Sequence, residues 1–449
     1  MKIVIVSNRG DLVTGGIEQW LLRLAASRER RGTEISVALP EHGPVEEALM
    51  SLGIPVMVFD AAWQPRTHAG RNRYLAGLDA RVAHLADWVD EQGADLVHSN
   101  ACYLLEGALA AMRAGRPHVW HIHSVFGTDA DPYVFGGLGL SPVRQASLLA
   151  MLSDGVGTVS AAAAKVFADA GIPVTLIRNR IDLDAFDHRR IALSNVDLRG
   201  ELGLARQTPL VAVVARISPE KDLPTFVECC AQIRNSLPTA HYLIIGNTTA
   251  NPRALQAVRD RINACGLHDR VHLLGERTDL PGLYPQFDLF MLTSTNEGLS
   301  SVLQEAMAAA LPVISTRSAG SDELIEDGVS GFLTPIGDAA ALADAALRCL
   351  NDRTLAASLG ARGRQKLERE SSWSDSLSAL ANFYHKVIER FSPSEQAIRR
   401  AFVDAAIGAL TDHAHLASDS ARVTATDEAK PARPSRGPAL LRWLTRPGG

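Results

Sequence analysis

Short apolar runs alternate with longer amphipathic helical patterns along most of this chain. Lys2–Ser7 and Pro209–Ala215 are apolar almost throughout, and a helical pattern follows each of them, at 17–31 and 223–235. Strands that are apolar on both faces and separated by helices are typical of parallel sheets with helices on both sides. The pattern therefore predicts an α/β fold built on parallel strands.

The alternation stops at a polar stretch, Asp182–Gln207, and then starts again. We therefore expect two successive α/β units rather than one large sheet, with the seam in this stretch. Further strands are predicted at 34–40, 55–60, 95–99, 118–123, 155–159 and 174–178, and then at 242–246, 270–274, 287–292, 312–316 and 331–333. Further helices are predicted at 44–52, 71–91, 252–265, 301–310 and 339–350. Ligands of open α/β sheets bind at the carboxyl ends of the strands, so two units that face one another would form a cleft there.

The amino-acid composition is that of a globular protein and excludes several other classes. The 449 residues are 46% apolar and 21% charged, with a net charge of −5, which is typical of a globular protein and gives no general reason to expect nucleic acid as a partner. No apolar stretch reaches the roughly 18 residues of a membrane-spanning helix. The strand-like run directly after Met1 leaves no room for a signal peptide, and the five cysteines are scattered. We expect neither disulfides nor a structural zinc site, and a cytoplasmic location.

The loop Asn8–Gly16 joins the first predicted strand to the first predicted helix. Its glycines, Gly10, Gly15 and Gly16, would let backbone N–H groups approach a phosphate or a sugar at the helix N-terminus. The spacing is not that of a dinucleotide fingerprint. A plain tight turn explains the loop equally well.

Two cations follow the first strand of the second unit. Arg216 and Lys221 leave the carboxyl end of that strand, where ligands collect. An arginine fork and a lysine point charge suit a diphosphate. The alternative is a solvated loop whose charges pair with Glu220 and Asp222.

A third segment places two carboxylates near one helix N-terminus. Glu297 precedes the helix predicted from Ser301, and Glu305 lies about one turn inside it. The first N–H groups of that helix, from Ser301, Val302 and Leu303, would offer an anion site, and the carboxylates could accept hydrogen bonds from ribose or sugar hydroxyls. Glu305 has apolar neighbours, so a buried position would require a partner for its charge.

Five separated motifs share their order and spacing with one known family: Gly15–Glu18; Arg216 with Lys221; Glu297 with Glu305–Ala308; Pro312–Thr316 with Ala319–Glu323; and Asp327–Phe332. Together they resemble the donor site of the family 4 retaining glycosyltransferases, also described as glycosyl transferases group 1. The resemblance covers roughly Lys2–Arg390, which is all but the tail.

The resemblance implies two facing Rossmann-like domains with a cleft between them, the GT-B fold. Residues 1–185 would form the acceptor-binding domain and 186–374 the nucleotide-sugar-binding domain. A helix at 375–391 would pack back on the first domain. Residues 392–449 would add a helix and a basic, disordered tail.

The resemblance also implies roles for the charged residues. Arg216 and Lys221 would bind the donor pyrophosphate and stabilise the leaving group. Glu305 would hold the ribose hydroxyls, and Glu297 would position the transferred sugar. The loop and helix start between them would complete the donor site, through Gly298, Leu299, Ser300, Ser301 and Val302.

Four further positions follow from the same resemblance. Gly16 would lie near the phosphates, and the loop that contains Gly275 and Arg277 near the base. His123 would lie close to the donor sugar at the reacting centre. His121 is the rival for that place, because it lies on the same face of the strand.

Such enzymes are thought to retain the anomeric configuration by front-face attack, with no clear protein nucleophile. The resemblance implies a UDP-sugar or GDP-mannose as donor and a glycan or lipid-linked acceptor, in cell-surface polysaccharide or glycolipid synthesis. No cofactor and no metal would be needed. A non-catalytic nucleotide-sugar-binding scaffold subunit is an alternative, and so is a sugar-nucleotide epimerase or phosphorylase of the same fold.

The sequence departs from the family pattern at three places. Arg180 stands where a small residue is usual, and we expect it either to face the cleft or to strain a turn. Gly246 lacks the usual second glycine after it, and Ser300 stands where glycine is frequent. In the tail, Pro438–Arg446 combines leucines and a tryptophan with arginines, which suggests a peripheral inner-membrane contact as an alternative to an unstructured end.

Overall fold

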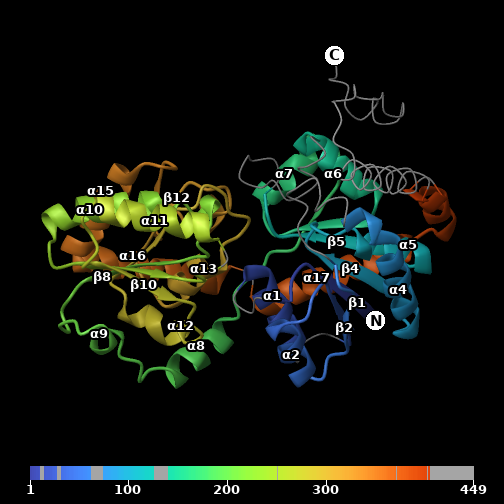
Figure 1. Ribbon diagram of the computed structural model, residues 1–449, viewed down its shortest axis with the longest axis horizontal. Helices are drawn as coiled ribbons and strands as arrows, with labels where there is room; N and C mark the ends of the chain where they lie inside the picture. Colours follow the sequence, from blue (N-terminus) through green and yellow to red (C-terminus); the bar gives the residue numbers. More distant parts are fainter. Residues whose placement is uncertain are drawn as a thin grey trace, which may run out of the picture. The chain divides into compact units, whose positions relative to one another are not determined.

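The computed structural model describes residues 1–10, 15–27, 32–61, 74–125, 140–249, 251–370, 372–401 and 403–404. They form two α/β units, each described here by itself (Figure 1). The first unit comprises Met1–Thr158, Ala164–Leu176 and the described residues from Leu380 onward. The second comprises Val159–Ala163 and Ile177–Ala379.

The first unit is built on a seven-stranded parallel sheet with the order β3-β2-β1-β4-β5-β6-β7. Its strands are β1 (Lys2–Ser7), β2 (Glu34–Leu39), β3 (Val56–Val58), β4 (Leu96–Asn100), β5 (His118–Ile122), β6 (Gly155–Thr158) and β7 (Thr175–Leu176). The helices between them are α1 (Gly16–Ala26), α2 (Pro44–Ser51), α4 (Leu78–Glu91), α5 (Glu106–Ala114), α6 (Pro142–Met151) and α7 (Ala161–Asp169).

The central strands of this sheet end in register on polar side chains. Ser7 of β1 is the partner of Asn100 in β4, and Asn100 is the partner of His121 in β5. All three are buried. The register therefore places a row of buried polar groups at the carboxyl edge of the first sheet.

The second unit is built on a six-stranded parallel sheet with the order β10-β9-β8-β11-β12-β13. Its strands are β8 (Leu210–Val214), β9 (His241–Ile245), β10 (Val271–Gly275), β11 (Leu289–Leu292), β12 (Val313–Thr316) and β13 (Phe332–Thr334). Its helices are α8 (Leu183–Ala192), α9 (Leu198–Glu201), η2 (Pro219–Lys221), α10 (Leu223–Ser236), α11 (Pro252–Ala264), α12 (Leu280–Leu283), η3 (Tyr284–Gln286), α13 (Ser301–Ala308), α14 (Ser321–Leu324), α15 (Ala339–Asn351) and α16 (Arg353–Arg369).

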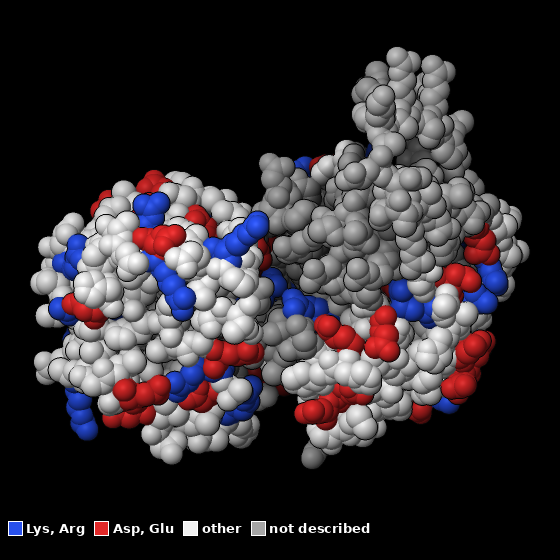
Figure 2. Space-filling model, viewed as in Figure 1, with Lys and Arg blue, Asp and Glu red and all other residues white. Residues whose placement is uncertain are grey.

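Both faces of the second sheet are buried, which explains why its strands are apolar throughout. Val211 and Val213 of β8 belong to a core with α10, α11 and α15. Their neighbours Ala212 and Val214 belong to another core with residues of α8, α12 and α13. Figure 1 shows α10, α11 and α15 on one side of this sheet and α8, α9 and α12 on the other. On the face of this unit shown in Figure 2, acidic and basic side chains are intermingled.

The strands predicted from the sequence are present, with ends that differ by a few residues. The predicted seam is wrong, because Asp182–Gln207 is part of the second unit. It contains α8 and α9, and Phe186 anchors α8 in the core. Helix α5 was not predicted. Residues 106–112 are all buried, so the helix lacks the alternation of polar and apolar faces by which a surface helix is predicted.

A long helix, α17 (Trp373–Arg390), begins in the second unit and continues into the first from Leu380. Gly155 at the start of β6 makes room for it, since a Cβ there would lie 2.8 Å from Val387 and 3.0 Å from Phe383. A further helical stretch follows, in which Gln396 donates a hydrogen bond to the carbonyl of Arg116. The predicted membrane segment 438–446 lies outside the described residues. Within them, no helix has the length and apolar character needed to cross a bilayer.

Candidate functional site

The strand order of the second sheet reverses between β8 and β11. These strands are hydrogen-bonded neighbours, although β9 and β10 lie between them in the sequence. In open α/β sheets the carboxyl ends of the strands at such a reversal are where ligands bind. The segments that follow these strands, 215–222 and 293–300, therefore form the candidate site.

Lys221 and Glu297 meet at this reversal. Lys221 Nζ donates a hydrogen bond to Glu297 Oε1 at 2.6 Å, and Ser294 Oγ donates to the same oxygen, also at 2.6 Å. The Lys221 and Glu297 side chains are only 16% and 10% exposed. An ion pair so far from bulk water is less screened than a surface pair. Two residues that the sequence assigned to one site are therefore in direct contact.

Backbone contacts hold Lys221 in place. Its carbonyl accepts a hydrogen bond from Thr293 Oγ1 at 2.9 Å, and the preceding carbonyl, of Glu220, accepts one from the Thr295 N–H at 2.8 Å. Asp222 then has a φ of +43°, a left-handed conformation that turns the chain into α10. The cation is therefore carried by a loop tied to the end of β11.

Arg216 lies in the same loop but is more exposed. Its side chain is 48% exposed and donates to Glu220 Oε1 at 3.3 Å. Ser218 Oγ donates to that same carboxylate oxygen at 2.7 Å. An exposed pair of this kind is weak, so Arg216 can exchange its partner for an anionic ligand at little cost. The alternative of pairing with Glu220 is thus realised in the structure.

Helix α13 begins where the sequence predicted. Ser300 is its N-cap, and the Ser300 hydroxyl accepts a hydrogen bond from the Leu303 N–H at 3.4 Å. The serine that departs from the family's glycine therefore caps the helix. In the described part of the chain, no acceptor is assigned to the N–H groups of Ser301 and Val302. Two of the three predicted donors thus remain available, and that of Leu303 does not.

Glu305 is only partly buried, and it has a hydrogen-bond partner on a neighbouring element. Tyr284 Oη donates to Glu305 Oε2 at 2.9 Å from a fully buried position. Burial, and then the charge of Glu305, raise the pKa of Tyr284 well above its usual value, so the phenol stays protonated and donates. Tyr284 lies just before β11 and was not predicted as a site residue.

The loop around Gly298 is packed against a second loop. The Gly320 N–H donates to the carbonyl of Glu297 at 2.9 Å. A Cβ at Gly320 would lie 2.2 Å from the carbonyl oxygen of Gly298, so no larger residue fits without a shift. Leu299 is buried beside this contact. The backbone that carries Glu297 is therefore fixed from both sides.

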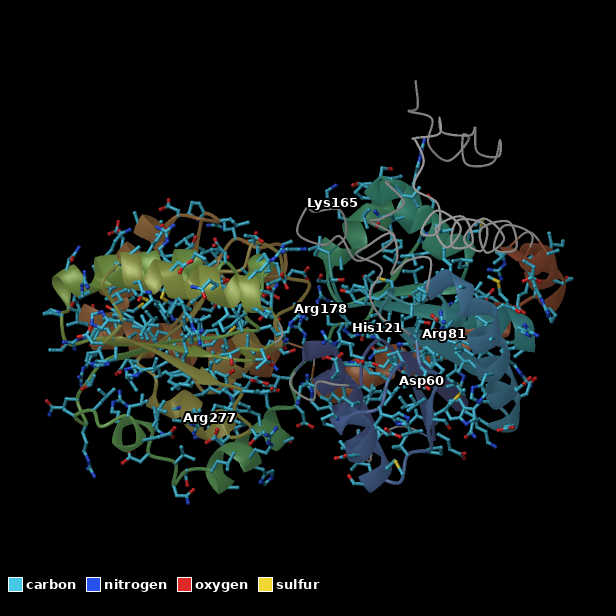
Figure 3. All side chains as sticks on the ribbon, in the orientation of Figure 1. Asp60, Arg81, His121, Lys165, Arg178 and Arg277 are labelled. Carbon is cyan, nitrogen blue, oxygen red and sulfur yellow. The ribbon has the colours of Figure 1, made fainter. Side chains whose placement is uncertain are left out.

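The loop that contains Gly275 and Arg277 was predicted to lie near the base. In the structure, its backbone at Gly275 is open, whereas the Arg277 side chain is bonded to other residues. Gly275 adopts a φ of +69° with open space around it. The Arg277 guanidinium, in contrast, forms four hydrogen bonds, two with Asp279 and two with Glu201, which raise its pKa. Figure 3 shows Arg277 beside α12. The Arg277 side chain is thus engaged by these two carboxylates, and a role of this loop in binding the base stays a prediction.

Arg180 does not strain a turn. It has no positive φ, and it is a buried residue whose Nη1 lies 2.9 Å from Glu370 Oε2. Gln304, on α13 next to Glu305, holds the backbone on both sides of Arg180. Gln304 Oε1 accepts from the Ile181 N–H at 3.1 Å, and its Nε2 donates to the Asn179 carbonyl at 3.0 Å. Arg180 can thus stand where a small residue is usual in the family, because Glu370 pairs with its charge.

In the first unit, Gly16 begins α1 and is exposed, with Gly15 as N-cap. A Cβ at Gly15 would lie 1.9 Å from Glu18 Oε2, so the first turn of α1 closes over the glycine. Residues 11–14 of the predicted loop lie outside the described residues. Gly16 thus begins the helix that follows β1, and its predicted place near the phosphates stays a prediction.

His123 follows β5 and bonds to the neighbouring strand. Its Nε2 lies 2.8 Å from Asn100 Oδ1. An amide oxygen only accepts, so in this arrangement the proton of His123 is on Nε2 and Nδ1 carries the lone pair. Trp20 of α1 packs edge-on against both His123 and His121, at 5.4 Å and 4.9 Å between ring centroids. His121 is fully buried, and Figure 3 shows it beside α1. Since His121 is the more enclosed, His123 remains the better candidate for ligand contact.

Burial keeps the histidines of this cluster neutral. The pKa of His123 is lowered well below its usual value, first by burial and then by the nearby His121 and His98. The pKa of His98, which bonds through Nδ1 to Tyr384 Oη, is also lowered, first by burial and then by the nearby His121 and His118. That of His118 is lowered to about 3 by burial and by Arg399. His98 of β4, His118 at the amino end of β5 and His123 just after β5 are therefore uncharged at neutral pH.

We expect the stability of the chain to fall as pH drops below about 6.5. The unfolded chain binds a proton on His118 near that pH, whereas the folded chain binds it only near pH 3, so stability is full above about 6.5 and is lost on acidification, at up to about 1.4 kcal/mol per pH unit. Urea denaturation at about pH 7.5 and about pH 5 measures the fall. The variant His118→Gln should lose less on acidification than the wild type. Equal losses in the two proteins would contradict this assignment.

Three residues of the site were missed by sequence reasoning. Ser294, Tyr284 and Asn100 each donate to or accept from a predicted residue. Asn100 ends β4 and Ser294 lies two residues after β11, so both lie at the carboxyl end of a strand, which is a usable signal. Tyr284 lies at the opposite end of β11 in sequence and carries no such signal.

Comparison with known proteins identifies the family. A family model described as Glycosyltransferase Family 4 matches residues 14–185, and one described as Glycosyl transferases group 1 matches residues 208–352. Together they cover more than half of the chain. The chain belongs to glycosyltransferase family 4. The predicted resemblance and the predicted pair of Rossmann-like α/β units, as in the GT-B fold, are thereby confirmed.

Three curated relatives of this family 4 chain carry names with different substrates. One is a lipopolysaccharide core biosynthesis mannosyltransferase of Rhizobium meliloti, 26% identical over 233 residues, or 51% of this chain and 66% of the relative. Another is a GDP-mannose-dependent α-(1-6)-phosphatidylinositol monomannoside mannosyltransferase of Mycobacterium tuberculosis, 28% identical over 262 residues, or 55% and 66%. The N-acetyl-α-D-glucosaminyl L-malate synthase of Bacillus anthracis aligns over 49% of its own length. The alignments thus span about half to two thirds of these relatives.

A solved relative is matched over a larger part of this family 4 chain. The structure of Anabaena Alr3699/HepE in complex with UDP and glucose is 27% identical, with a TM-score of 0.71, over 86% of this chain and 100% of the relative. The sucrose-phosphate synthase of Thermosynechococcus elongatus, 19% identical with a TM-score of 0.69, shares the fold.

Proposed function

We propose that this chain transfers a hexosyl unit from a nucleotide-sugar to a hydroxyl group of a glycan or lipid-linked acceptor. The observation that carries the proposal is the Lys221–Glu297 pair at the strand reversal of the second sheet. A cation and a carboxylate at this place suit a ligand with both a diphosphate and sugar hydroxyls. The likeness to a relative solved with UDP and glucose supports the same ligand class.

The donor is held by the second unit in this proposal. Lys221 and Arg216 bind the diphosphate, together with the N–H groups of Ser301 and Val302 at the start of α13. Glu305, oriented by Tyr284, accepts hydrogen bonds from the ribose hydroxyls. Glu297 accepts hydrogen bonds from the transferred sugar. The backbone around Gly275 remains for the base, since the Arg277 side chain is engaged elsewhere.

Catalysis in this scheme is charge stabilisation and positioning. As the bond between the sugar and the β-phosphate breaks, negative charge grows on the diphosphate, and Lys221 and Arg216 already lie there to stabilise it. The leaving phosphate accepts the acceptor's proton, so attack occurs on the same face and the configuration is retained. These cations let us propose a reaction that needs no metal and no resident cofactor. The contact predicted between His123 and the transferred sugar stays a prediction.

The test is a donor panel with the purified full chain. UDP-glucose, UDP-galactose and GDP-mannose are offered with sugar and polyprenyl-linked acceptors, with and without EDTA, and nucleoside diphosphate release is followed. We expect one donor class to react in an acceptor-dependent way, unaffected by EDTA, and the anomeric signal of the product to show retention. Binding of a nucleotide-sugar without turnover over a broad acceptor panel would favour a scaffold subunit, and loss of activity with EDTA would contradict metal independence.

A further inference from the structure

One oxygen of Glu297 carries both of the carboxylate's short hydrogen bonds. Lys221 Nζ and Ser294 Oγ each lie 2.6 Å from Oε1. In the part of the chain that the structure describes, no donor is assigned to Oε2. The carboxylate is therefore held by one oxygen, and the other is left for a ligand.

The two donors differ in rigidity. Lys221 reaches Glu297 through a four-carbon chain and is also the cation proposed for the diphosphate. Ser294 is fully buried, and its Oγ is one atom away from the backbone. Its carbonyl accepts a hydrogen bond from Thr316 Oγ1 of β12, which fixes that backbone to the sheet. Ser294 is therefore the fixed donor and Lys221 the movable one.

We propose that Ser294 is a positioning residue, whose hydroxyl orients Glu297 so that Oε2 faces the hydroxyls of the transferred sugar. When a diphosphate draws the Lys221 ammonium toward itself, the bond from Ser294 keeps the carboxylate from turning. Transfer depends on this orientation because reacting groups must be held within a fraction of an ångström. The inference rests on the proposed function of the site.

The hydrogen bond between Tyr284 and Glu305 can be compared with the one between Ser294 and Glu297. Glu305 too accepts from a buried hydroxyl, that of Tyr284. Because Glu305 is proposed to contact ribose, which UDP and UDP-glucose share, Tyr284→Phe should weaken both ligands alike. Because Glu297 is proposed to contact the sugar, Ser294→Ala should leave UDP binding intact. The two variants therefore separate recognition of the nucleotide from recognition of the sugar.

The experiment uses the full chain and the variants Ser294→Ala, Ser294→Cys and Tyr284→Phe. Ser376→Ala is the control, because Ser376 is a buried serine of α17 whose hydroxyl donates to the carbonyl of Ser372 and, within the described residues, to no other group. Calorimetry with UDP and UDP-glucose, and with GDP and GDP-mannose, gives affinities. Initial rates give kcat and KM, and thermal unfolding reports on the fold.

For Ser294→Ala we expect kcat to fall about 10- to 100-fold, as for other residues that orient a ligand-binding group, with diphosphate affinity and unfolding temperature unchanged. Ser294→Cys, which keeps a weak donor, should lie between Ala and the wild type. An unchanged kcat, or a loss matched by diphosphate affinity or by unfolding, would overturn the inference alone. A wild type that binds neither the diphosphates nor the nucleotide-sugars would overturn the proposed function, and the inference with it.

Discussion

Replacing Lys221 by alanine is expected to lower glycosyl transfer about 1,000-fold while the protein stays folded. The ammonium is the largely buried cation at the strand reversal, and no other cation contacts Glu297 in the described residues. Its loss removes the charge that stabilises the leaving diphosphate and one of the two donors that hold Glu297. Initial rates with the preferred donor measure the effect, and circular dichroism checks the fold.

Lys165→Ala is the matched control for this prediction. Lys165 lies on α7 with a side chain that is 73% exposed, and it pairs with Asp169 one turn away (Figure 3). Removing such a surface pair should leave both rate and stability nearly unchanged. A Lys221→Ala variant that transfers at the control's rate would show that the donor diphosphate does not lie at this lysine.

Replacing Arg81 by methionine is expected to destabilise the first unit by about 3–5 kcal/mol. Arg81 Nε donates to Glu106 Oε1 at 2.8 Å, and the Glu106 side chain is fully buried. Tyr74 Oη donates to the other oxygen at 2.7 Å, and its ring lies under the Arg81 guanidinium. Methionine keeps much of the apolar stem but leaves a buried carboxylate without its cation (Figure 3). Urea denaturation followed by circular dichroism gives the free energy of unfolding.

Arg113→Met is the control for Arg81. Arg113 also belongs to this unit and also pairs with an aspartate, Asp79, but both side chains are exposed, at 42% and 84%. Its replacement should change the unfolding free energy very little. If the two variants unfold at the same urea concentration, the buried pair does not hold this unit together.

The strands and the order of charged motifs could be predicted from the sequence, because both are local. The apolar residues of Lys2–Ser7 are enough to predict a buried strand. Arg216 and Lys221 are separated by only four residues, so they lie in one loop. The meeting of Lys221 with Glu297, 76 positions away, follows once β8 and β11 are adjacent. From the sequence, the pairing of β8 with β11 could be expected only through the resemblance to a known family.

The partners of the charged residues could not be predicted, because they are set by packing. Tyr284 contacts Glu305 because η3 and α13 pack on the same side of the sheet. No motif near Tyr284 in the sequence predicts this contact. Arg277 was expected near the base, yet Glu201 and Asp279 engage its guanidinium. Arg180 was expected to face a cleft or to strain a turn; its φ is not positive, and its partner Glu370 lies 190 positions away in the sequence.

The measurement that tests the account most directly is calorimetric titration of the purified full chain with UDP and with GDP, side by side. We expect one of them to bind with a Kd between about 1 μM and 1 mM, the range usual for enzyme substrates, and Lys221→Ala to weaken this binding. The diphosphate that binds then identifies the donor class. Binding of neither diphosphate would contradict the assignment of a donor site to the strand reversal of the second sheet.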